Sequence, residues 1–190
     1  MTIEFQPWPK TPRLNGASMV ITEKIDGTNA AVVISDDYEV GAQSRNRLIT
    51  PENDNYGFAK WVWENADKLR EILGPGHHYG EWWGSGIQRG YGLTNGEKRF
   101  SLFNTGRWAD ELWKSENEGI KVQGLDIVPV LYEGHLDTED IRKTVRHLEV
   151  CGSYASPGFD KPEGVIVYIP RSNSMFKVLI ENDDIPKGLV

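Results

Sequence analysis

Apolar and polar residues alternate with the period of a β-strand in several parts of the chain. Residues 18–48 predict three consecutive strands, with turns near residues 26–27 and 36–37. The third strand spans about residues 39–43 and leads into a loop that contains Arg45. Further strands are predicted at residues 77–84, 99–103, 124–130, 164–169 and 175–180.

Three other stretches have the period of a helix. Apolar side chains recur at helical spacing over residues 55–73, and the Gly-Pro-Gly at residues 74–76 ends the pattern. Residues 138–148 predict an amphipathic helix capped by Asp137 or Thr138, and residues 109–114 predict a short one. Strands outnumber helices and no linker or repeat divides the chain. We therefore expect one α+β domain over residues 1–190, built mainly on antiparallel sheets with flanking helices.

The composition is that of a globular protein in a reducing compartment. The 190 residues are 38% hydrophobic and 26% charged, and their apolar runs are far shorter than the roughly 20 residues that span a bilayer. The N-terminus lacks the features of a signal peptide, and no membrane partner is expected. Cys151 is the only cysteine, which excludes an intramolecular disulfide and a thiolate metal cluster. A cytoplasmic location is the simplest expectation.

The net charge limits the kinds of partner. At −7 it counts against a protein that binds nucleic acid through its overall charge, since such proteins are usually basic. An acidic enzyme can still act on nucleic acid if its cations gather on one face.

Lys24 has an unusual place in this pattern. It closes an apolar run that begins at Met19 and is followed almost at once by the turn pair Asp26-Gly27. An amine at the lip of a sheet, beside acids and a glycine, can serve as a nucleophile once it is deprotonated.

Other predicted strands also end in chemically active residues. Charged or aromatic residues lie at these ends beside or near a glycine, at Lys24, Arg45, Glu81, Phe103, Glu163 and Lys177. Cations suit phosphates, carboxylates suit ribose hydroxyls or Mg²⁺, and an aromatic ring suits a base. Together they indicate a site for a nucleoside triphosphate.

In this order the residues resemble the motifs of the covalent nucleotidyltransferase superfamily, which includes ATP-dependent DNA ligases, RNA ligases and mRNA capping enzymes. The motifs are Lys24-Ile25-Asp26-Gly27-Thr28-Asn29, Arg45, Tyr79-Gly80-Glu81, Phe100-Ser101-Leu102-Phe103, Glu163-Gly164 and Lys177. They cover about residues 20–180. Asn29 is typical of the RNA ligase branch, because the other branches more often have arginine there. The resemblance implies the ATP-grasp-like nucleotidyltransferase fold of a ligase adenylylation domain.

The resemblance also implies which residues hold the nucleoside. Glu23 would help to read the adenine edge, in part through its backbone, and Phe103 would stack on the base, with Phe100 as the alternative. Arg45 and Glu81 would hold the ribose.

The remaining residues would act on the phosphates. Lys24 would attack the α-phosphate of ATP, release pyrophosphate and hold AMP through a phosphoramidate bond. Asn29 would orient the phosphate or its metal-bound water, and Glu163 would bind Mg²⁺ or Mn²⁺. Lys177 would contact the α-phosphate as negative charge develops there.

Two features depart from the family pattern. The last motif usually has two lysines separated by one residue, but here Lys177 is alone, so that Arg171 is one candidate for the second cation. Few residues follow Lys177 in the sequence, so no C-terminal OB or helical domain is expected. A protein partner could supply such a domain.

The implied function is that of an ATP-dependent RNA ligase in RNA repair. AMP would pass from Lys24 to a 5′-phosphate, and a 3′-hydroxyl would then displace it. The ends would be nucleic acid, with RNA favoured over DNA. The alternatives are an ATP-dependent DNA ligase, a capping-type nucleotidyltransferase, and a module that binds nucleotides or RNA ends without turnover.

A few other residues have two interpretations. Basic residues near the expected site are candidates for binding a 5′-phosphate, namely Arg89, Lys98, Arg99 and Arg107. The basic residues of 138–148 indicate a solvated helix face, with contact to nucleic acid as the alternative. His77 and His78 point to opposite faces of a strand and do not suggest a metal site. Of Trp82 and Trp83, alternation predicts that one packs inward and the other shields a cleft.

Overall fold

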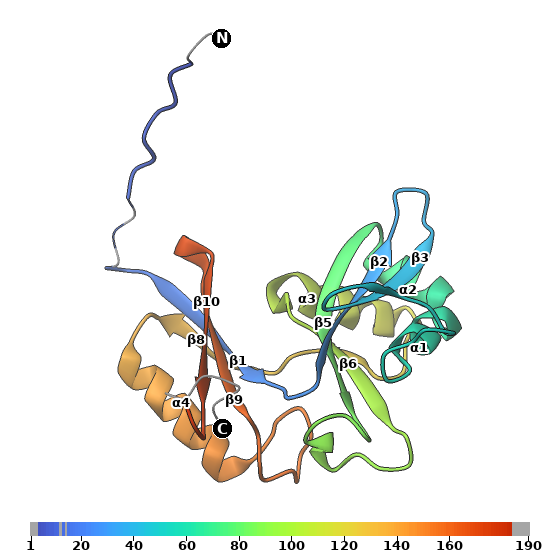
Figure 1. The fold of residues 1–190 in the computed structure, drawn as a ribbon. Coiled ribbons are helices and arrows are strands. Elements are labelled where there is room, and N and C mark those ends of the chain that lie inside the picture. Colours follow the sequence, from blue (N-terminus) through green and yellow to red (C-terminus); the bar gives the residue numbers. More distant parts are fainter. Residues whose placement is uncertain (1–3, 12, 14, 184–190) are drawn as a thin grey trace.

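The computed structural model describes residues 4–11, 13 and 15–183, and its strands form two sheets (Figure 1). The first sheet has the order β10-β9-β1-β8 and is antiparallel throughout. Its strands are β1 (Ser18–Lys24), β8 (Val130–His135), β9 (Gly164–Ile169) and β10 (Ser174–Leu179). The second sheet has the order β4-β3-β2-β5-β6-β7, and only its β6–β7 pair is parallel. Its strands are β2 (Thr28–Ile34), β3 (Val40–Ser44), β4 (Leu48–Ile49), β5 (Gly76–Gly84), β6 (Lys98–Leu102) and β7 (Leu125–Ile127).

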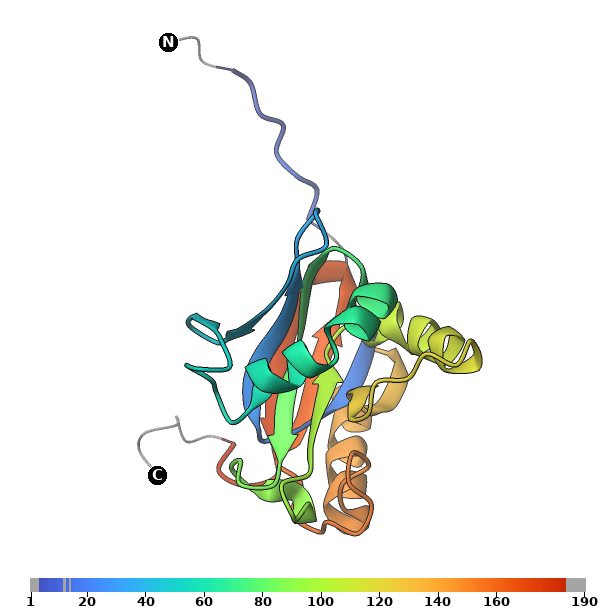
Figure 2. The ribbon, with the colours of Figure 1, turned by 90° about the vertical axis from the view of Figure 1, so that its right-hand side faces the viewer.

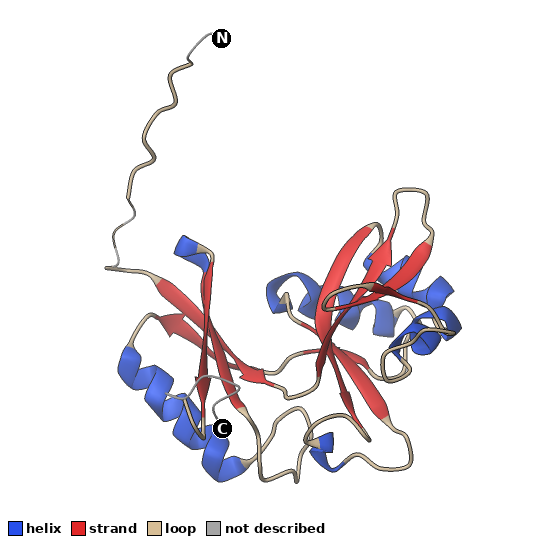
Figure 3. Ribbon diagram, in the orientation of Figure 1, coloured by secondary structure: helices blue, strands red, loops and turns tan. Residues whose placement is uncertain are grey.

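Four α-helices accompany the two sheets, which confirms the predicted α+β class with mainly antiparallel sheets (Figure 3). They are α1 (Phe58–Glu64), α2 (Ala66–Leu73), α3 (Thr105–Asn117) and α4 (Thr138–Cys151), with short 3₁₀ turns at η1 (Gly90–Gly92) and η2 (Pro170–Ser172). Figure 2 shows α1 and α2 lying across the six-stranded sheet. Among the described residues, no helix has the length and apolar character needed to cross a bilayer.

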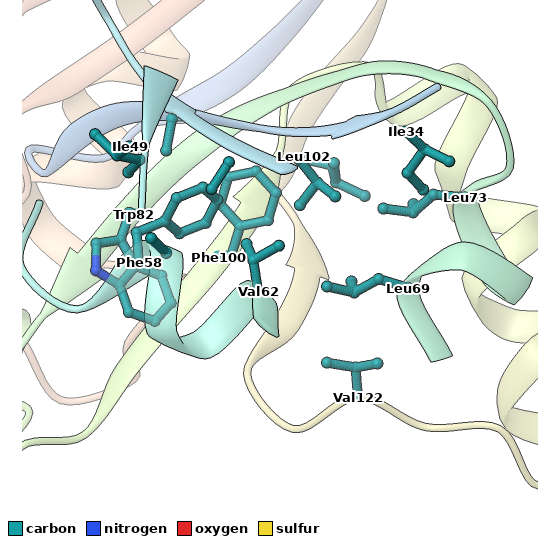
Figure 4. Close-up of a cluster of buried hydrophobic side chains, with 14 of the residues drawn as sticks. Ile34, Ile49, Phe58, Val62, Leu69, Leu73, Trp82, Phe100, Leu102 and Val122 are labelled. Carbon is teal, nitrogen blue, oxygen red and sulfur yellow. The ribbon is translucent and has the colours of Figure 1, made fainter. Parts of the chain in front are cut away.

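The six-stranded sheet buries one face under α1, α2 and α3. Alternate residues of β2, such as Val32 and Ile34, point into this core, as do Trp82 of β5 and Phe100 of β6. Figure 4 shows Ile34, Trp82 and Phe100 together with apolar residues of α1 and α2. Burial of so much apolar surface is the main contribution to the stability of this half of the molecule.

The four-stranded sheet has its own core against α4. Met19 and Ile21 of β1 pack with Val165 and Val167 of β9 and with Leu148 of the helix. The carboxylate of Asp137 accepts a hydrogen bond from the N–H of Glu139 at 2.8 Å, so this residue caps α4 as one of the two predicted candidates.

Three predicted elements differ from the structure. The helix expected over residues 55–73 is two helices, because Asn65 leaves helical geometry and its side chain donates to the carbonyl of Trp61 at 2.8 Å. The helix expected at residues 109–114 is longer, since Asn104 caps it and it runs from Thr105 to Asn117. The strand expected at residues 124–130 corresponds to two strands. β7 lies at the edge of the six-stranded sheet, and β8, which begins at Val130, belongs to the four-stranded sheet.

The structure also differs from the turn predicted at Asp26-Gly27. β1 and β2 do not pair with each other but belong to different sheets, so residues 25–27 form a crossover from one sheet to the other. A second crossover runs from β7 to β8, and the two lie together, because the N–H of Glu23 donates to the carbonyl of Pro129 at 2.9 Å. The sheets are thus joined where Lys24 lies.

Candidate functional site

Lys24 is the last residue of β1, directly before the crossover. Its ammonium forms an ion pair with the carboxylate of Glu163. The Lys24 side chain is 19% exposed and that of Glu163 only 5%, so the pair lies at the edge of the interior with the amine toward solvent. Two predicted site residues, distant in the sequence, are therefore in contact.

The strand register explains this contact. Lys24 lies opposite Gly164 in the β1–β9 ladder, and Glu163 immediately precedes that glycine. Gly164 has a φ of +155°, and a Cβ there would collide with the carbonyl of Val178 on β10. A glycine is needed at this position so that three strands can close on one another beside the pair.

Glu81 and Asn29 form a second group on the other sheet. They are partners in the β2–β5 ladder, and the amide of Asn29 donates to Glu81 at 3.0 Å. The N–H of Gly27 donates to the other carboxylate oxygen of Glu81, also at 3.0 Å. The crossover is thereby fixed to the carboxylate that the sequence predicts as a ribose ligand.

The charge of Glu81 is affected by its surroundings. Burial raises the pKa of Glu81 to about 7, and the negative charges of Glu163 and Asp26 act in the same direction. The hydrogen bond from Gly27 and the positive charge of Lys24 lower the pKa and offset part of this rise. The charges of Glu163, Asp26 and Lys24 thus lie close enough to Glu81 to change its pKa.

Lys177 lies on the same sheet face as Lys24. It pairs with Ile166, which pairs in turn with Thr22, two residues before Lys24 on β1. Alternation therefore directs both lysines to one face, two strands or about 10 Å apart across the sheet. Lys177 is exposed on the edge strand β10.

Arg171 does not reach this region. It follows the far end of the β9–β10 ladder, and its guanidinium donates to the carbonyl of Arg13 at 2.7 Å. The expectation that Arg171 replaces a second lysine is therefore wrong, because the length of the ladder separates it from Lys24.

Glu23 points away from Lys24, to the opposite face of β1, and is 1% exposed. Its carboxylate accepts hydrogen bonds from the hydroxyl of Ser153 at 2.6 Å and from the N–H groups of Tyr154 and Ala155 at 2.8 and 2.9 Å. Burial raises its pKa and these hydrogen bonds oppose the rise. The side chain anchors the loop after α4, so that an adenine contact would fall to the backbone of Glu23.

Arg45 and Phe103 are accessible. Arg45 is exposed in the loop after β3. Phe103 follows β6 and is 41% exposed, whereas Phe100 is fully buried in the core of the six-stranded sheet. Phe100 is therefore excluded as the base-stacking ring.

Tyr91 is a site residue that the sequence does not reveal. Its hydroxyl accepts a hydrogen bond from the N–H of Asp26 at 2.9 Å and donates to the carbonyl of Lys24 at 3.4 Å. The residue is fully buried, has a φ of +50°, and packs on Phe159 with ring centroids 4.6 Å apart. Within a glycine-rich stretch it resembles an ordinary loop residue, so no pattern marks it.

The candidate phosphate-binding arginines are engaged elsewhere. Arg89 pairs with Asp26 at 3.2 Å, Arg99 pairs with Glu97 at 2.7 Å, and Arg107 lies over the ring of Trp108 at 4.2 Å on the helical side. Of these, Arg89 lies nearest the crossover, and the contact of Arg107 with a 5′-phosphate stays a prediction. Lys98 lies at the start of β6, paired with Gly84.

The structure also places the histidines and tryptophans of β5 and the basic residues of α4. His78 is buried, with Nε2 2.8 Å from the carbonyl of Gly74, and the described residues hold no cluster of three or more metal-ligating side chains. Trp82 and Trp83 do face opposite sides, but both are buried, so neither is the exposed shield of a cleft. The basic residues of α4 form surface pairs such as Lys143–Asp140, as a solvated face does.

Comparison with known proteins gives a consistent result. A family model described as RNA ligase matches residues 17–179. A Naegleria gruberi RNA ligase mutant with AMP and Mn is 20% identical with a TM-score of 0.67, over 87% of this chain and 50% of that chain. Another mutant with ATP and Mn is 18% identical with a TM-score of 0.67, over 88% and 51% of the chains. No curated protein matches. The chain thus spans about half the length of these solved structures, whose likeness at this identity is one of fold.

Proposed function

The chain belongs to the RNA ligase family, and on that premise we propose that it is an ATP-dependent RNA ligase that forms lysyl-AMP at Lys24. The observation that carries the proposal is the Lys24–Glu163 pair at the junction of the sheets. Around it lie Glu81, Asn29 and, on the same face as Lys24, Lys177.

In the first step, the neutral amine of Lys24 attacks the α-phosphorus of ATP. A P–N bond forms, the bond from the α-phosphorus to the pyrophosphate oxygen breaks, and pyrophosphate leaves with the electron pair. The ammonium of Lys24 must first release a proton to water, which removes the charge attraction to Glu163, and the proton that the nitrogen loses as the P–N bond forms also goes to water. Lys177 would stabilise the charge that develops on the α-phosphate oxygens.

Mg²⁺ or Mn²⁺ fits the acidic residues at this junction. Mg²⁺ is usually held by one or two carboxylates together with substrate phosphates, and Glu163 is a buried carboxylate in contact with Lys24. Glu163 would hold the ion, which would neutralise charge on the triphosphate. The related Naegleria structures with ATP and Mn support this choice of ligands.

The nucleoside would lie on the six-stranded sheet. Glu81 and Arg45 would hold the ribose, Phe103 would stack on the adenine, and Asn29 would orient the phosphate. Glu81 and Asn29 are already fixed to each other at 3.0 Å, so the sheet presents them in place before ATP binds.

In the later steps AMP would move to the 5′-phosphate of an RNA end, and a 3′-hydroxyl would displace AMP and seal the strand. RNA is favoured over DNA because the family is that of RNA ligases. We place this activity in RNA repair in the cytoplasm, where the lone Cys151 stays reduced. A partner protein could contribute a further domain for holding the strand.

Labelling tests the proposal. The protein is incubated with Mg²⁺ and ATP labelled at the α-phosphate, and retained label is measured after denaturing electrophoresis. Lys24→Ala and Lys24→Arg should lose the label, whereas Lys60→Ala, a change of an exposed lysine on α1, should keep it. An unlabelled wild-type protein, or a labelled Lys24→Ala variant, contradicts the proposal. Labelling by GTP instead indicates a capping-type enzyme, and sealing of nicked DNA in preference to RNA indicates a DNA ligase.

A further inference from the structure

The six-stranded sheet carries aromatic rings on the face opposite its hydrophobic core. In β5, His78 and Trp82 point toward the helices, so alternation directs His77, Tyr79 and Glu81 to the other face. Phe103, after β6, continues this face, since its N–H donates to the carbonyl of Tyr79 at 3.0 Å. We name His77, Tyr79 and Phe103 the aromatic row.

The aromatic row is open to solvent, unlike the rest of this face. Tyr79 is 55% exposed and Phe103 is 41% exposed, and His77 is exposed as well. Farther along β5 on the same face, Trp83 is buried beneath Tyr91. Packing therefore accounts for Trp83 at one end of this face, whereas the described part of the chain leaves the rings of Tyr79 and Phe103 at the other end exposed.

The rings are arranged for stacking. The rings of His77 and Tyr79 are nearly parallel, at 21°, with centroids 6.1 Å apart. Tyr79 and Phe103 are neighbours across two paired strands, and Glu81 is the next residue of β5 on this face. The aromatic row thus begins beside the proposed ribose ligand and leads away from Lys24.

Nucleobases are the ligands that best fit exposed rings on a sheet face. Single-stranded RNA is often bound by aromatic side chains that stack on unpaired bases, including rings on the surface of a sheet. Because the net charge is −7, electrostatic attraction to RNA phosphates is a weak source of affinity here. Base stacking therefore contributes a larger share of the binding free energy.

We propose that Tyr79 and His77 form a binding site for unpaired bases of the RNA strand, continuous with the adenine site at Phe103. The strand would enter along β5, and its end would reach the phosphates beside Lys24. The link to the adenine site rests on the proposed function, whereas the stacking site itself rests on the exposed rings.

Binding and adenylylation, measured on the same variants, test this proposal. Anisotropy of a fluorescent, 5′-phosphorylated single-stranded RNA measures binding, and label retained from ATP measures adenylylation. Tyr79→Ala should weaken RNA binding by roughly 5- to 150-fold, the range expected from loss of one stacked base. Tyr79→Phe keeps the ring and should bind nearly as the wild type does. Trp113→Ala, which removes an exposed ring on α3, is the matched control and should not weaken binding.

The pattern across variants decides the outcome. Tyr79→Ala should harm RNA binding more than adenylylation, and Phe103→Ala should harm adenylylation more than RNA binding. His77→Ala should resemble Tyr79→Ala and provides a second variant if Tyr79→Ala is poorly folded by its melting curve. The proposal is overturned if Tyr79→Ala and His77→Ala bind RNA as the wild type does, or if Tyr79→Ala raises the KM for ATP as much as Phe103→Ala does.

This test separates the two proposals. If the wild-type protein forms lysyl-AMP but RNA binding does not depend on Tyr79, only the stacking site is wrong. If RNA binding depends on Tyr79 while no lysyl-AMP forms, the stacking site is supported and the proposed function fails.

Discussion

At the scale of single residues, Tyr91 shows how the backbone is held at Lys24, the residue that we propose as the nucleophile. Its hydroxyl bonds to one backbone group on each side of Ile25, the carbonyl of Lys24 and the N–H of Asp26. These bonds fix the backbone from which the Lys24 side chain projects. A left-handed conformation at a fully buried tyrosine costs about 1 kcal/mol or more, and the surrounding packing must maintain it.

Tyr91→Phe should therefore slow adenylylation and destabilise the protein. The ring stays packed, but the N–H of Asp26 loses its partner, which costs about 1–3 kcal/mol. The rate of label incorporation and the urea midpoint measure the two effects. Tyr132→Phe removes a hydroxyl that bonds to Asp140 near α4, and it should leave the labelling rate unchanged. Equal rates in wild type and Tyr91→Phe would refute the positioning role.

Glu81 should make the stability of the ligand-free protein depend on pH. Folded Glu81 keeps its proton up to a pKa of about 7, whereas the unfolded residue releases it near 4.5. The folded state binds more protons in this window, so the free energy of unfolding falls as pH rises from about 4.5 to 7. The whole change is on the order of 3 kcal/mol. Urea unfolding at several pH values should show a smaller fall in Glu81→Gln, and an unchanged slope would assign the effect to another group.

The sequence pattern of charged residues at predicted strand ends succeeds for part of the candidate site, although Glu81 and Lys177 lie within β5 and β10. Lys24 and Glu163 follow from such a pattern, and they do meet. Tyr91 and the loop held by Glu23 could not be predicted in this way, because their contacts depend on how two loops fold against the crossover. Periodicity carries no information on such contacts between loops.

At the scale of elements, close packing determines the path of the crossover. A Cβ on Gly27 would lie 2.5 Å from the carbonyl of Trp82 and 2.8 Å from the Cβ of Trp83. The motif glycine is thus required by the approach of the crossover to β5, and not by a tight turn between paired strands. Local patterns predicted the strands well. They could not show that β1 and β2 belong to different sheets, because strand pairing depends on packing between residues that are far apart in the sequence.

Gly27→Ala should destabilise the protein by about 1–3 kcal/mol, because backbone atoms must move to admit the methyl group. It should also reduce adenylylation, since the hydrogen bond from Gly27 to Glu81 would be displaced. Gly106→Ala is a matched control on α3, where a Cβ meets nothing within 4 Å. This control should stabilise by about 0.5–1 kcal/mol. A Gly27→Ala variant as stable as wild type would show that the crossover is looser than described.

At the scale of the whole molecule, the two sheets have separate cores joined by a small third cluster. Ile25 and Val128 come from the two crossovers, and they pack with Trp83 and Tyr91. Ile25 directly follows Lys24 in the sequence. The relative position of the sheets and the geometry of the site therefore depend on the contacts of the same cluster.

Trp83→Ala should uncouple the two sheets. Loss of a buried tryptophan costs about 3–5 kcal/mol, and Trp83 belongs to the cluster that contains the crossover residues Ile25 and Val128. Calorimetry should show one unfolding transition for the wild type and two for the variant. Phe58→Ala removes a comparable ring from the six-stranded core alone and should lower the melting temperature with a single transition. Two transitions in the wild type would contradict the coupling.

The order of strands has a consequence for synthesis on the ribosome. The chain is made from its N-terminus, but β1 must wait for partners that begin at Val130 and Gly164, while β2 to β7 are consecutive and can pair as they emerge. Lys24 meets Glu163 only when β9 is made, and Lys177 comes later still. A nascent chain therefore carries Lys24 long before it carries Glu163 and Lys177, and the lysyl-AMP that we propose requires that β9 and β10 have been made.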